Sequence, residues 1–408
     1  MTTSQALSHE RENQVARHNV VIYAICQALN GAASPVNIAV GGLAGSYLLG
    51  PDKSLATLPV TGFSVGMAIG TATAAFLTRL FGRKYGFIVG LNVGVIGMLL
   101  ATHALLTGNF WYFCLGTTAN GISAGFGQQY RFAATDRGTR EFKAKAISWV
   151  LAGGVAAAII GPQLVIFTTD LLLPVHFAGA FLSASMLFVL AMIAMMFLDT
   201  SSPQIQTTSK QPHEARPLIQ ILSQPRFLVA LLCGTSSFAL MSFVMTGAPL
   251  AMVGCGFTKE TAVLGIQWHV LAMFAPSFFT GNLIARFGNE RVVGVGMIIL
   301  IACSVVALAG IALWNFWLSL ILLGLGWNFA FIGATAMVSE TYEPHERNKV
   351  QGTNDFILFS FVALASLMSG IVLNNFGWTT LNIIVFPIVA LCIISLMCLS
   401  RSSRRLPL

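Results

Sequence analysis

The chain is a succession of apolar runs of about 20 residues, separated by short polar turns. A helix of that length crosses the ~30 Å hydrocarbon core of a bilayer. Because that core offers no water to backbone N–H and C=O groups, each run must be an α-helix, and the alternation typical of membrane β-barrels is absent. Charged residues make up only 9% of the chain. The sequence therefore predicts an all-α protein that crosses a membrane many times.

A polar stretch with four prolines, residues 199–226, separates two apolar blocks of similar length. We expect an N-terminal half over residues 1–198 and a C-terminal half over residues 227–408, with residues 199–226 as a cytoplasmic linker. Six spans are expected in each half. The twelve expected spans are residues 19–46, 56–79, 85–107, 111–132, 144–167, 172–198, 227–252, 261–285, 290–313, 316–339, 350–373 and 378–400.

Positive charge predicts the orientation of these spans. If the N-terminus is inside, all 22 Lys and Arg residues except Lys53 and Lys259 fall on the cytoplasmic side. Both termini are then cytoplasmic. The formal net charge of +8 is explained by topology, so nucleic acid is not expected as a partner. The polar N-terminus leads into a span too long for a signal peptide, so no cleavage is expected.

The two halves carry related loops. Ala75–Gly86 follows the second span and Gly281–Val292 follows the eighth, and each places a small residue seven positions before a glycine that precedes charge. Duplication of six helices is typical of transporters built from internal repeats. The sequence therefore predicts two pseudo-symmetric six-helix halves.

Twelve spans, a central linker and these loops resemble the major facilitator superfamily, whose loop motif is Gly-x-x-x-Asp-x-x-Gly-Arg-Arg/Lys. In the first loop the second glycine and both basic residues match, while Ala75 replaces the first glycine and Arg79 replaces the acid. Because Arg79 stands where the family has its acid, the contact that this acid usually makes with a helix end is not expected here. The residues of the loop motif are Arg79, Gly82, Arg83, Lys84 and, in the second half, Gly288. The resemblance implies transport by alternating access, in which the two halves rock about a central site.

Shorter tracts bear on the substrate. Gln267–Gly288, Leu325–Phe329 and Asn354–Phe356 look like a bacterial subgroup that includes riboflavin importers, which implies a bacterial inner-membrane protein. Gly161-Pro162 looks like part of a family motif linked to exporters, although its trailing glycine pair is missing. Uptake of a nutrient or vitamin such as a flavin and export of drugs or metabolites both stay open. A membrane sensor without transport is a remote third alternative.

No motif for catalysis is found in the chain. It lacks a GxxxxGK[ST] phosphate loop, and its His-Glu dipeptides lack the HExxH spacing of zinc proteases. The seven cysteines are odd in number and show no CxxC spacing, so neither disulfides nor a zinc site is indicated. We expect no enzyme activity, no cofactor and no metal. The expected partners are the bilayer, a small solute and, as coupling ion, protons; one chain holds both halves, so a monomer is expected.

Polar side chains form stripes at helical spacing on the first, fourth and tenth spans, and the resemblance implies that spans 1, 4, 7 and 10 line the cavity. Tryptophans within spans would stack on a planar ligand. The alternative is that these side chains bond helices together, each hydrogen bond contributing roughly 0.6–2 kcal/mol. The candidate substrate-binding residues are Gln27, Asn30, Asn37, Asn120, Gln128, Arg131, Trp149, Gln163, Trp268, Trp327 and Asn328.

Ionisable residues inside spans are few, and burying one unpaired costs several kcal/mol, so they are candidates for proton coupling or gating. Asp355 lies within the eleventh span, and Arg131 and Glu340 lie at the inner ends of the fourth and tenth. We hypothesise that Arg131 pairs with Asp355 or Glu340 across the halves and that a proton on Asp355 weakens this pair. A static ion pair is the alternative. His269 could carry a proton or could be a hydrogen-bonded packing residue.

Overall fold

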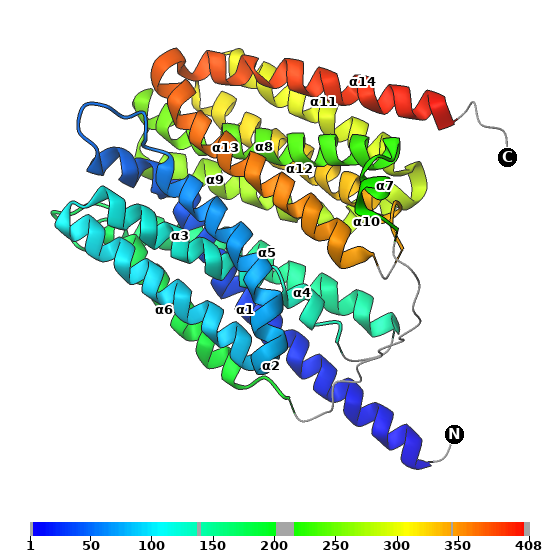
Figure 1. Ribbon diagram of the computed structural model, residues 1–408. Helices are drawn as coiled ribbons and strands as arrows, with labels where there is room; N and C mark the ends of the chain where they lie inside the picture. Colours follow the sequence, from blue (N-terminus) through cyan, green and yellow to red (C-terminus); the bar gives the residue numbers. More distant parts are fainter. Residues whose placement is uncertain (1–2, 137–139, 201–215, 344–345, 404–408) are drawn as a thin grey trace. The chain divides into compact units, whose positions relative to one another are not determined.

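The computed structural model describes residues 3–136, 140–200, 216–343 and 346–403, which form helices joined by short loops (Figure 1). The helices belong to two compact units. One unit comprises Met1–Ala44 and Gly62–Ser209, and the other comprises Gly45–Thr61 and Lys210–Leu408. The all-α prediction is confirmed over the described residues. The division into six plus six spans stays a prediction.

The first unit contains most of α1 and α2, followed by four further helices (Figure 1). The bounds are α1 Thr3–Leu48, α2 Leu58–Thr107, α3 Phe110–Gly127, α4 Tyr130–Ala133, α5 Arg140–Thr168 and α6 Ala178–Met196. The second unit contains the remaining helices. These are α7 Leu218–Leu222, α8 Pro225–Gly254, α9 Lys259–Phe274, α10 Ser277–Phe287, α11 Asn289–Leu308, α12 Leu313–Ser339, α13 Arg347–Ile383 and α14 Val385–Ser403.

The α2 run reverses its direction at Gly82. A Cβ atom added to Gly86 would lie 2.8 Å from the Cα of Thr78. Eight residues of continuous helix would separate these positions by about 12 Å. The chain therefore folds back, and α2 is two antiparallel helical legs joined at Gly82.

The backbone at Gly82 is repeated in the second unit. Gly82 has φ 77° and ψ 165°, and Gly288, between α10 and α11, has φ 84° and ψ 158°. This region of backbone space is essentially restricted to glycine. The two loops that were paired from sequence thus make the same turn with the same residue type.

Seven helical stretches in the described part of the chain are long and apolar enough to cross a membrane, or eight if α9 and α10, which are bent by 42°, form one span. Two of the seven, Leu58–Thr107 and Lys349–Arg401, contain 50 and 53 residues. At 1.5 Å per residue, each stretch holds more than twice the helix needed for one ~30 Å crossing, and each is broken at a glycine, Gly82 or Gly377. The protein is a multi-pass membrane protein, and the count of twelve stays a prediction.

In the first unit, glycines bring the first leg of α2 into backbone contact with α3. Gly66 and Gly70 form one GxxxG pair, and Gly121 and Gly125 form another. A Cβ atom added to Gly66 would meet the carbonyl oxygen of Thr118, and one added to Gly125 would lie 2.6 Å from the carbonyl oxygen of Met67. Small residues permit this approach between membrane helices. The spacing of the glycines therefore sets how closely these two helices pack.

Glycines also join α5 to α1. A Cβ atom on Gly153 would meet the carbonyl oxygen of Ala24, and one on Gly161 would meet that of Ala32. Ala32 and Ala157 are buried together with Leu187 of α6. In this structure Gly161, part of the tract that looks like an exporter motif, is therefore a close-packing residue.

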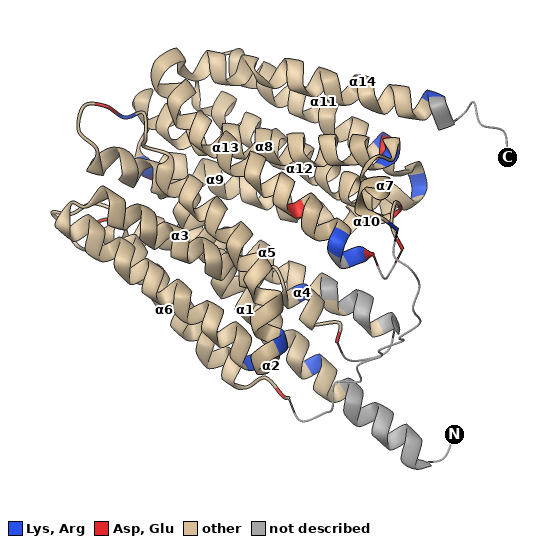
Figure 2. Ribbon diagram, in the orientation of Figure 1, with Lys and Arg blue, Asp and Glu red and all other residues tan. Residues whose placement is uncertain are grey.

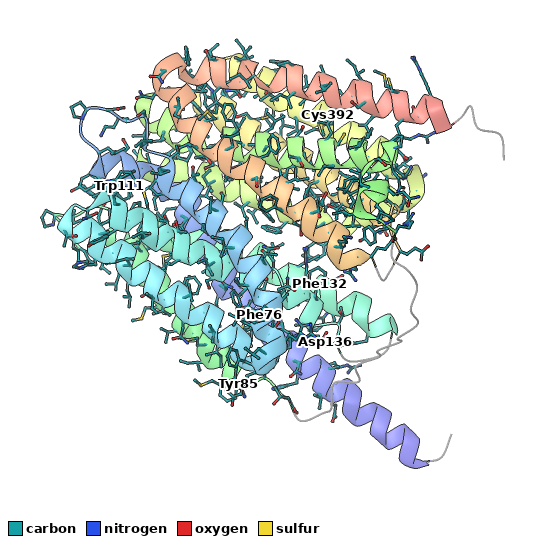
Figure 3. The ribbon with its side chains drawn as sticks, in the orientation of Figure 1. Phe76, Tyr85, Trp111, Phe132, Asp136 and Cys392 are labelled. Carbon is teal, nitrogen blue, oxygen red and sulfur yellow. The ribbon has the colours of Figure 1, made fainter. Side chains whose placement is uncertain are left out.

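Charge and aromatic residues are distributed as a bilayer requires. Lys, Arg, Asp and Glu gather at helix ends and loops, and the helices are otherwise almost free of charge (Figure 2). In the first unit, Trp111 and Tyr85 lie at opposite ends of the helices and both are exposed (Figure 3). Aromatic residues favour the two interfaces of a membrane. The separation of charged ends from apolar middles supports the assignment of these helices as membrane spans.

Candidate substrate site

Three buried asparagines mark the polar interior of the first unit. Asn30 of α1 donates from Nδ2 to the carbonyl oxygen of Ser123 (3.3 Å) and to the hydroxyl of Tyr130 (3.3 Å). Its Oδ1 has no hydrogen-bond partner among the described residues. The polar stripe predicted on the first span therefore faces α3, and it keeps a free acceptor there.

Asn37 and Asn120 are more unusual. Their exposed fractions are 0% and 1%, and neither amide nitrogen nor amide oxygen has a partner within the described parts of the chain. A buried polar group without a hydrogen bond costs about 1–3 kcal/mol. Two amides left in this way offer both donors and acceptors to whatever polar molecule reaches them.

The other residues expected to bind substrate in this unit lie in different surroundings. Gln27 is half-buried against α5, beside Gly153. Gln128 and Arg131 are exposed, and the guanidinium of Arg131 lies 4.9 Å above the ring of Phe132. These side chains do not share the buried environment of the asparagines. Two further candidates lie in α5, also outside that environment. Trp149 is exposed and Gln163 is half-buried.

In the second unit, Asn328 uses its whole amide on its neighbours. Its Nδ2 donates to the carbonyl oxygen of Met273 (2.7 Å) and to the hydroxyl of Ser277 (2.7 Å), and its Oδ1 accepts from Thr280 (2.6 Å). Met273 lies in the last turn of α9, where helix carbonyls lack intrahelical partners. Asn328 therefore bonds α12 to the bend between α9 and α10. Its contacts agree with the alternative that these polar side chains bond helices together instead of binding substrate.

An aromatic cluster surrounds Trp327, the neighbour of Asn328. Trp327 is stacked with Phe331, with ring centroids 5.1 Å apart and planes at 14°. Phe238 of α8 lies edge-on to both rings and to Phe359 of α13. The indole Nε1 of Trp327 is buried and has no partner among the described residues.

Sequence reasoning identified Trp327 but not the three phenylalanines. The four-residue spacing of Trp327 and Phe331 was the available signal, whereas Phe238 and Phe359 join from other helices. Trp268 of α9 is 43% exposed and has no described contact with this cluster.

The ionisable candidates of the second unit have local partners. Asp355 of α13 is half-buried, and its Oδ1 accepts from the side chain of Asn354 (3.1 Å). The ring of His269 is fully buried in α9, with its Nδ1 2.8 Å from the carbonyl oxygen of Leu320. The Nε2 of His269 has no described partner. One ring nitrogen of His269 is therefore held by the carbonyl oxygen of Leu320, and the other nitrogen is available to bind a proton.

Glu340 belongs to an ionic network within the second unit. It accepts hydrogen bonds from Arg226 and from the amide of Asn289 (2.7 Å), and Arg226 also pairs with Glu290 (2.7 Å). The pairing of Arg131 with Asp355 or Glu340 across the halves stays a prediction.

The basic residues of the first loop motif hold the end of the first unit together. Arg83 makes two hydrogen bonds to Asp136, at 2.9 and 3.3 Å, and Asp136 lies just beyond α4 (Figure 3). Lys84 donates to the carbonyl oxygen of Met196 (2.5 Å), the last residue of α6. A cation at a helix C-terminus is stabilising. Arg79 is exposed.

Sequence reasoning also missed an ion pair at the end of the linker. Arg216 contacts Glu346 through its Nε (2.8 Å), its Nη2 (2.6 Å) and its backbone nitrogen (3.1 Å). The Glu346 side chain is only 2% exposed. Hydrogen bonds from Arg216 lower the pKa of the Glu346 carboxyl to about 2. The linker is thus fixed at Arg216 to the loop between α12 and α13.

Comparison with known proteins identifies the family. A model described as Major Facilitator Superfamily matches residues 20–276 and 268–407. The chain is 49% identical to the riboflavin transporter RfnT of Brucella anthropi, over 93% of this chain and 95% of RfnT. It is 28% identical to YddS of Bacillus subtilis, an uncharacterized MFS-type transporter, over 92% and 89% of the two chains.

The fold is also found in a solved transporter structure. The crystal structure of an auto-inhibited POT family peptide transporter matches with a TM-score of 0.67 at 14% identity, covering 96% of this chain and 98% of that one. The resemblance inferred from the loop motif and the repeated halves is confirmed. The chain belongs to the Major Facilitator Superfamily.

Proposed function

We propose that this protein takes up a flavin-like vitamin across the bacterial inner membrane by alternating access, with both termini in the cytoplasm. The observation that carries the proposal is the 49% identity with riboflavin transporter RfnT, which extends over nearly the full length of both chains. The aligned region extends over 382 residues, so the similarity is not confined to one helix or one motif. A shared substrate class is the simplest reason for it.

The buried amides of the first unit support a polar organic substrate. Asn37 and Asn120 offer two donors and two acceptors that no described residue uses, and Asn30 offers a further acceptor. A flavin carries carbonyls, ring nitrogens and a hydroxylated side chain, which need both kinds of partner. These three asparagines are therefore the leading substrate contacts among the candidate residues.

For energy coupling we propose that protons enter through Asp355, whose carboxylate lies within a span, and that His269 assists through its unpartnered Nε2. Replacement of Asp355 by Asn keeps the shape of the side chain and removes its titration. Uptake by Asp355→Asn is then expected to lose its dependence on external pH. Uptake with the wild-type pH profile would exclude Asp355 as the coupling group.

Uptake of radiolabelled riboflavin tests the main proposal. Cells without their own importer are expected to accumulate label only when they express this chain. Asn120→Ala is expected to reduce uptake at least tenfold at low substrate, because one buried hydrogen bond to substrate is lost and its partner is left unpaired. Asn92→Ala is the matched control, since the exposed Asn92 amide bonds only to its own helix, at the carbonyl oxygen of Ile88. Wild-type protein present in the membrane without uptake would refute the function.

A further inference from the structure

We propose that Trp327, Phe238, Phe331 and Phe359 form the surface of the second unit on which a planar heteroaromatic ring of the substrate binds, and that Trp327 donates its Nε1–H to an acceptor on the edge of that ring. The inference rests on the proposed function, because it assigns the ring of a flavin-like substrate to one set of side chains. It adds a stacking site and a donor in the second unit to the asparagines of the first.

The four rings come from three helices and converge on Phe238. The ring centroid of Phe238 is 5.3 Å from that of Trp327, 5.2 Å from that of Phe331 and 5.9 Å from that of Phe359. All three contacts are edge-on, with interplanar angles of 88°, 87° and 71°. Edge-on contacts use the positive edge of one ring against the negative face of another. The cluster thus holds its rings in fixed orientations.

The cluster is not a sealed part of the core. Phe238, Phe331 and Phe359 are each partly exposed, whereas core rings such as Phe227 and Phe316 are 0–1% exposed. An aromatic surface with both buried and accessible rings can accept another flat ring by stacking. The accessible parts of these phenylalanines are the place where a substrate ring would lie.

The unpartnered indole nitrogen is an independent observation that indicates a ligand. Trp327 is 93% buried, with a 7% exposed fraction, yet its Nε1 has no acceptor among the described residues. Buried indole N–H groups usually find a partner. In the same helix, the Nε1 of Trp317 donates to the carbonyl oxygen of Thr261 at 3.3 Å. The donor of Trp327 is therefore left for a group that the described residues do not supply.

Trp378 has the other buried indole nitrogen without a partner among the described residues. Its ring has one described ring contact, with Phe316, and it lies beside the chain turn at Gly377. Trp378 packs in a cluster with buried Phe316 and with the half-buried Phe257 and Trp317. Trp327 differs from Trp378 in that it is only 7% exposed, whereas Trp378 is half-buried, and in that its ring is stacked on that of Phe331.

The chemistry of a flavin ring matches the combination of an unused donor and a stacking surface at Trp327. Its fused ring system is planar and can stack, and its edge carries carbonyl oxygens and ring nitrogens that accept hydrogen bonds. An indole N–H is a donor only, so it selects an acceptor at that edge. The sugar-alcohol chain of the vitamin has no planar group, and the cluster therefore recognises the ring.

Binding of riboflavin to the purified full-length protein in lipid nanodiscs tests the proposal, with quenching of flavin fluorescence as the signal. Trp327→Phe keeps an aromatic ring and removes the N–H, so affinity is expected to fall about tenfold, the loss of one buried hydrogen bond. Phe238→Leu removes the central ring and is expected to weaken binding to a similar extent. Trp314→Phe is the matched control, because Trp314 lies at the exposed start of α12.

Lumichrome, the flavin ring system without its sugar-alcohol chain, separates ring recognition from recognition of the chain. Lumichrome is expected to compete with riboflavin on the wild type and to lose about tenfold in potency on Trp327→Phe, whereas ribitol is expected not to compete on either. Melting temperatures of the ligand-free variants show whether each one is folded. If Trp327→Phe proves unstable, the affinity of Phe238→Leu for riboflavin and lumichrome decides the test.

The outcomes distinguish the two proposals. Wild type that binds neither riboflavin nor lumichrome would overturn the proposed function, and this inference with it. Wild type that binds riboflavin, together with folded Trp327→Phe and Phe238→Leu proteins that bind it as tightly as Trp314→Phe does, would overturn the aromatic site alone and leave the function standing.

Discussion

Replacement of Asn328 by Ala separates a structural role from a role in the substrate site. The substitution removes three hydrogen bonds, to Met273, Ser277 and Thr280. Such bonds between membrane helices contribute about 0.6 kcal/mol each on average, and a buried carbonyl left without a donor costs about 1–3 kcal/mol. We therefore expect a loss of roughly 3–5 kcal/mol, with most of the effect at the bend between α9 and α10.

The assay is thermal unfolding of the purified protein, followed by intrinsic fluorescence, with riboflavin uptake measured in parallel. For a unit of about 200 residues, 1 kcal/mol shifts the melting temperature by roughly 2–4 °C, so a decrease of about 6–20 °C is expected. Thr335→Ala is the control on the same helix, since the exposed Thr335 hydroxyl bonds only to its own helix, at the carbonyl oxygen of Phe331. An unchanged melting temperature combined with weaker substrate affinity would refute the reasoning and place Asn328 in the substrate site.

Two further predictions concern the ends of the helices. Glu346→Gln removes the charge that pairs with Arg216, and it is expected to lower the melting temperature at pH 7. Because the pKa of Glu346 is about 2 in the folded protein against an ordinary 4.5, its contribution is complete above pH 4.5 and is lost as pH falls toward 2. The difference between wild type and variant should therefore shrink over that window, and a difference that stays constant would contradict the pairing. Gly82→Ala is expected to destabilise the protein by about 1–3 kcal/mol, because alanine is strained at φ 77°. Gly281→Ala is its control, because a Cβ atom there meets no atom within 4 Å, and equal melting temperatures for the two variants would count against strain at Gly82.

The apolar runs in the sequence were sufficient to predict the helices, and the repeated loop motif was sufficient to predict that the two loops are related. The equivalence of Gly82 and Gly288 could be inferred because the motif is local, and the structure gives both glycines nearly the same backbone angles. The burial of Asn30, Asn37 and Asn120 likewise agrees with polar residues on inward-facing stripes. Local pattern and burial therefore identify the polar interior of the first unit.

The partners of the candidate residues could not be inferred in the same way. Asn328 lies on a polar stripe, but its amide is used by Met273 at the end of another helix, and that geometry depends on where α9 bends. The pair of Arg216 and Glu346 joins residues 130 positions apart, with many other charges available to each in the sequence. Stripes show which side chains are buried, whereas three-dimensional packing determines which of them stay available to a substrate.

The glycine contacts between α2 and α3 have a consequence for motion. Gly66 and Gly70 of α2 and Gly121 and Gly125 of α3 bring the two backbones into contact, so at these four positions no flexible side chain lies between the helices to absorb displacement. Sliding by even one residue would drive the intervening Cβ atoms into the facing carbonyls. The first leg of α2 and α3 are therefore expected to move as one rigid pair through the transport cycle.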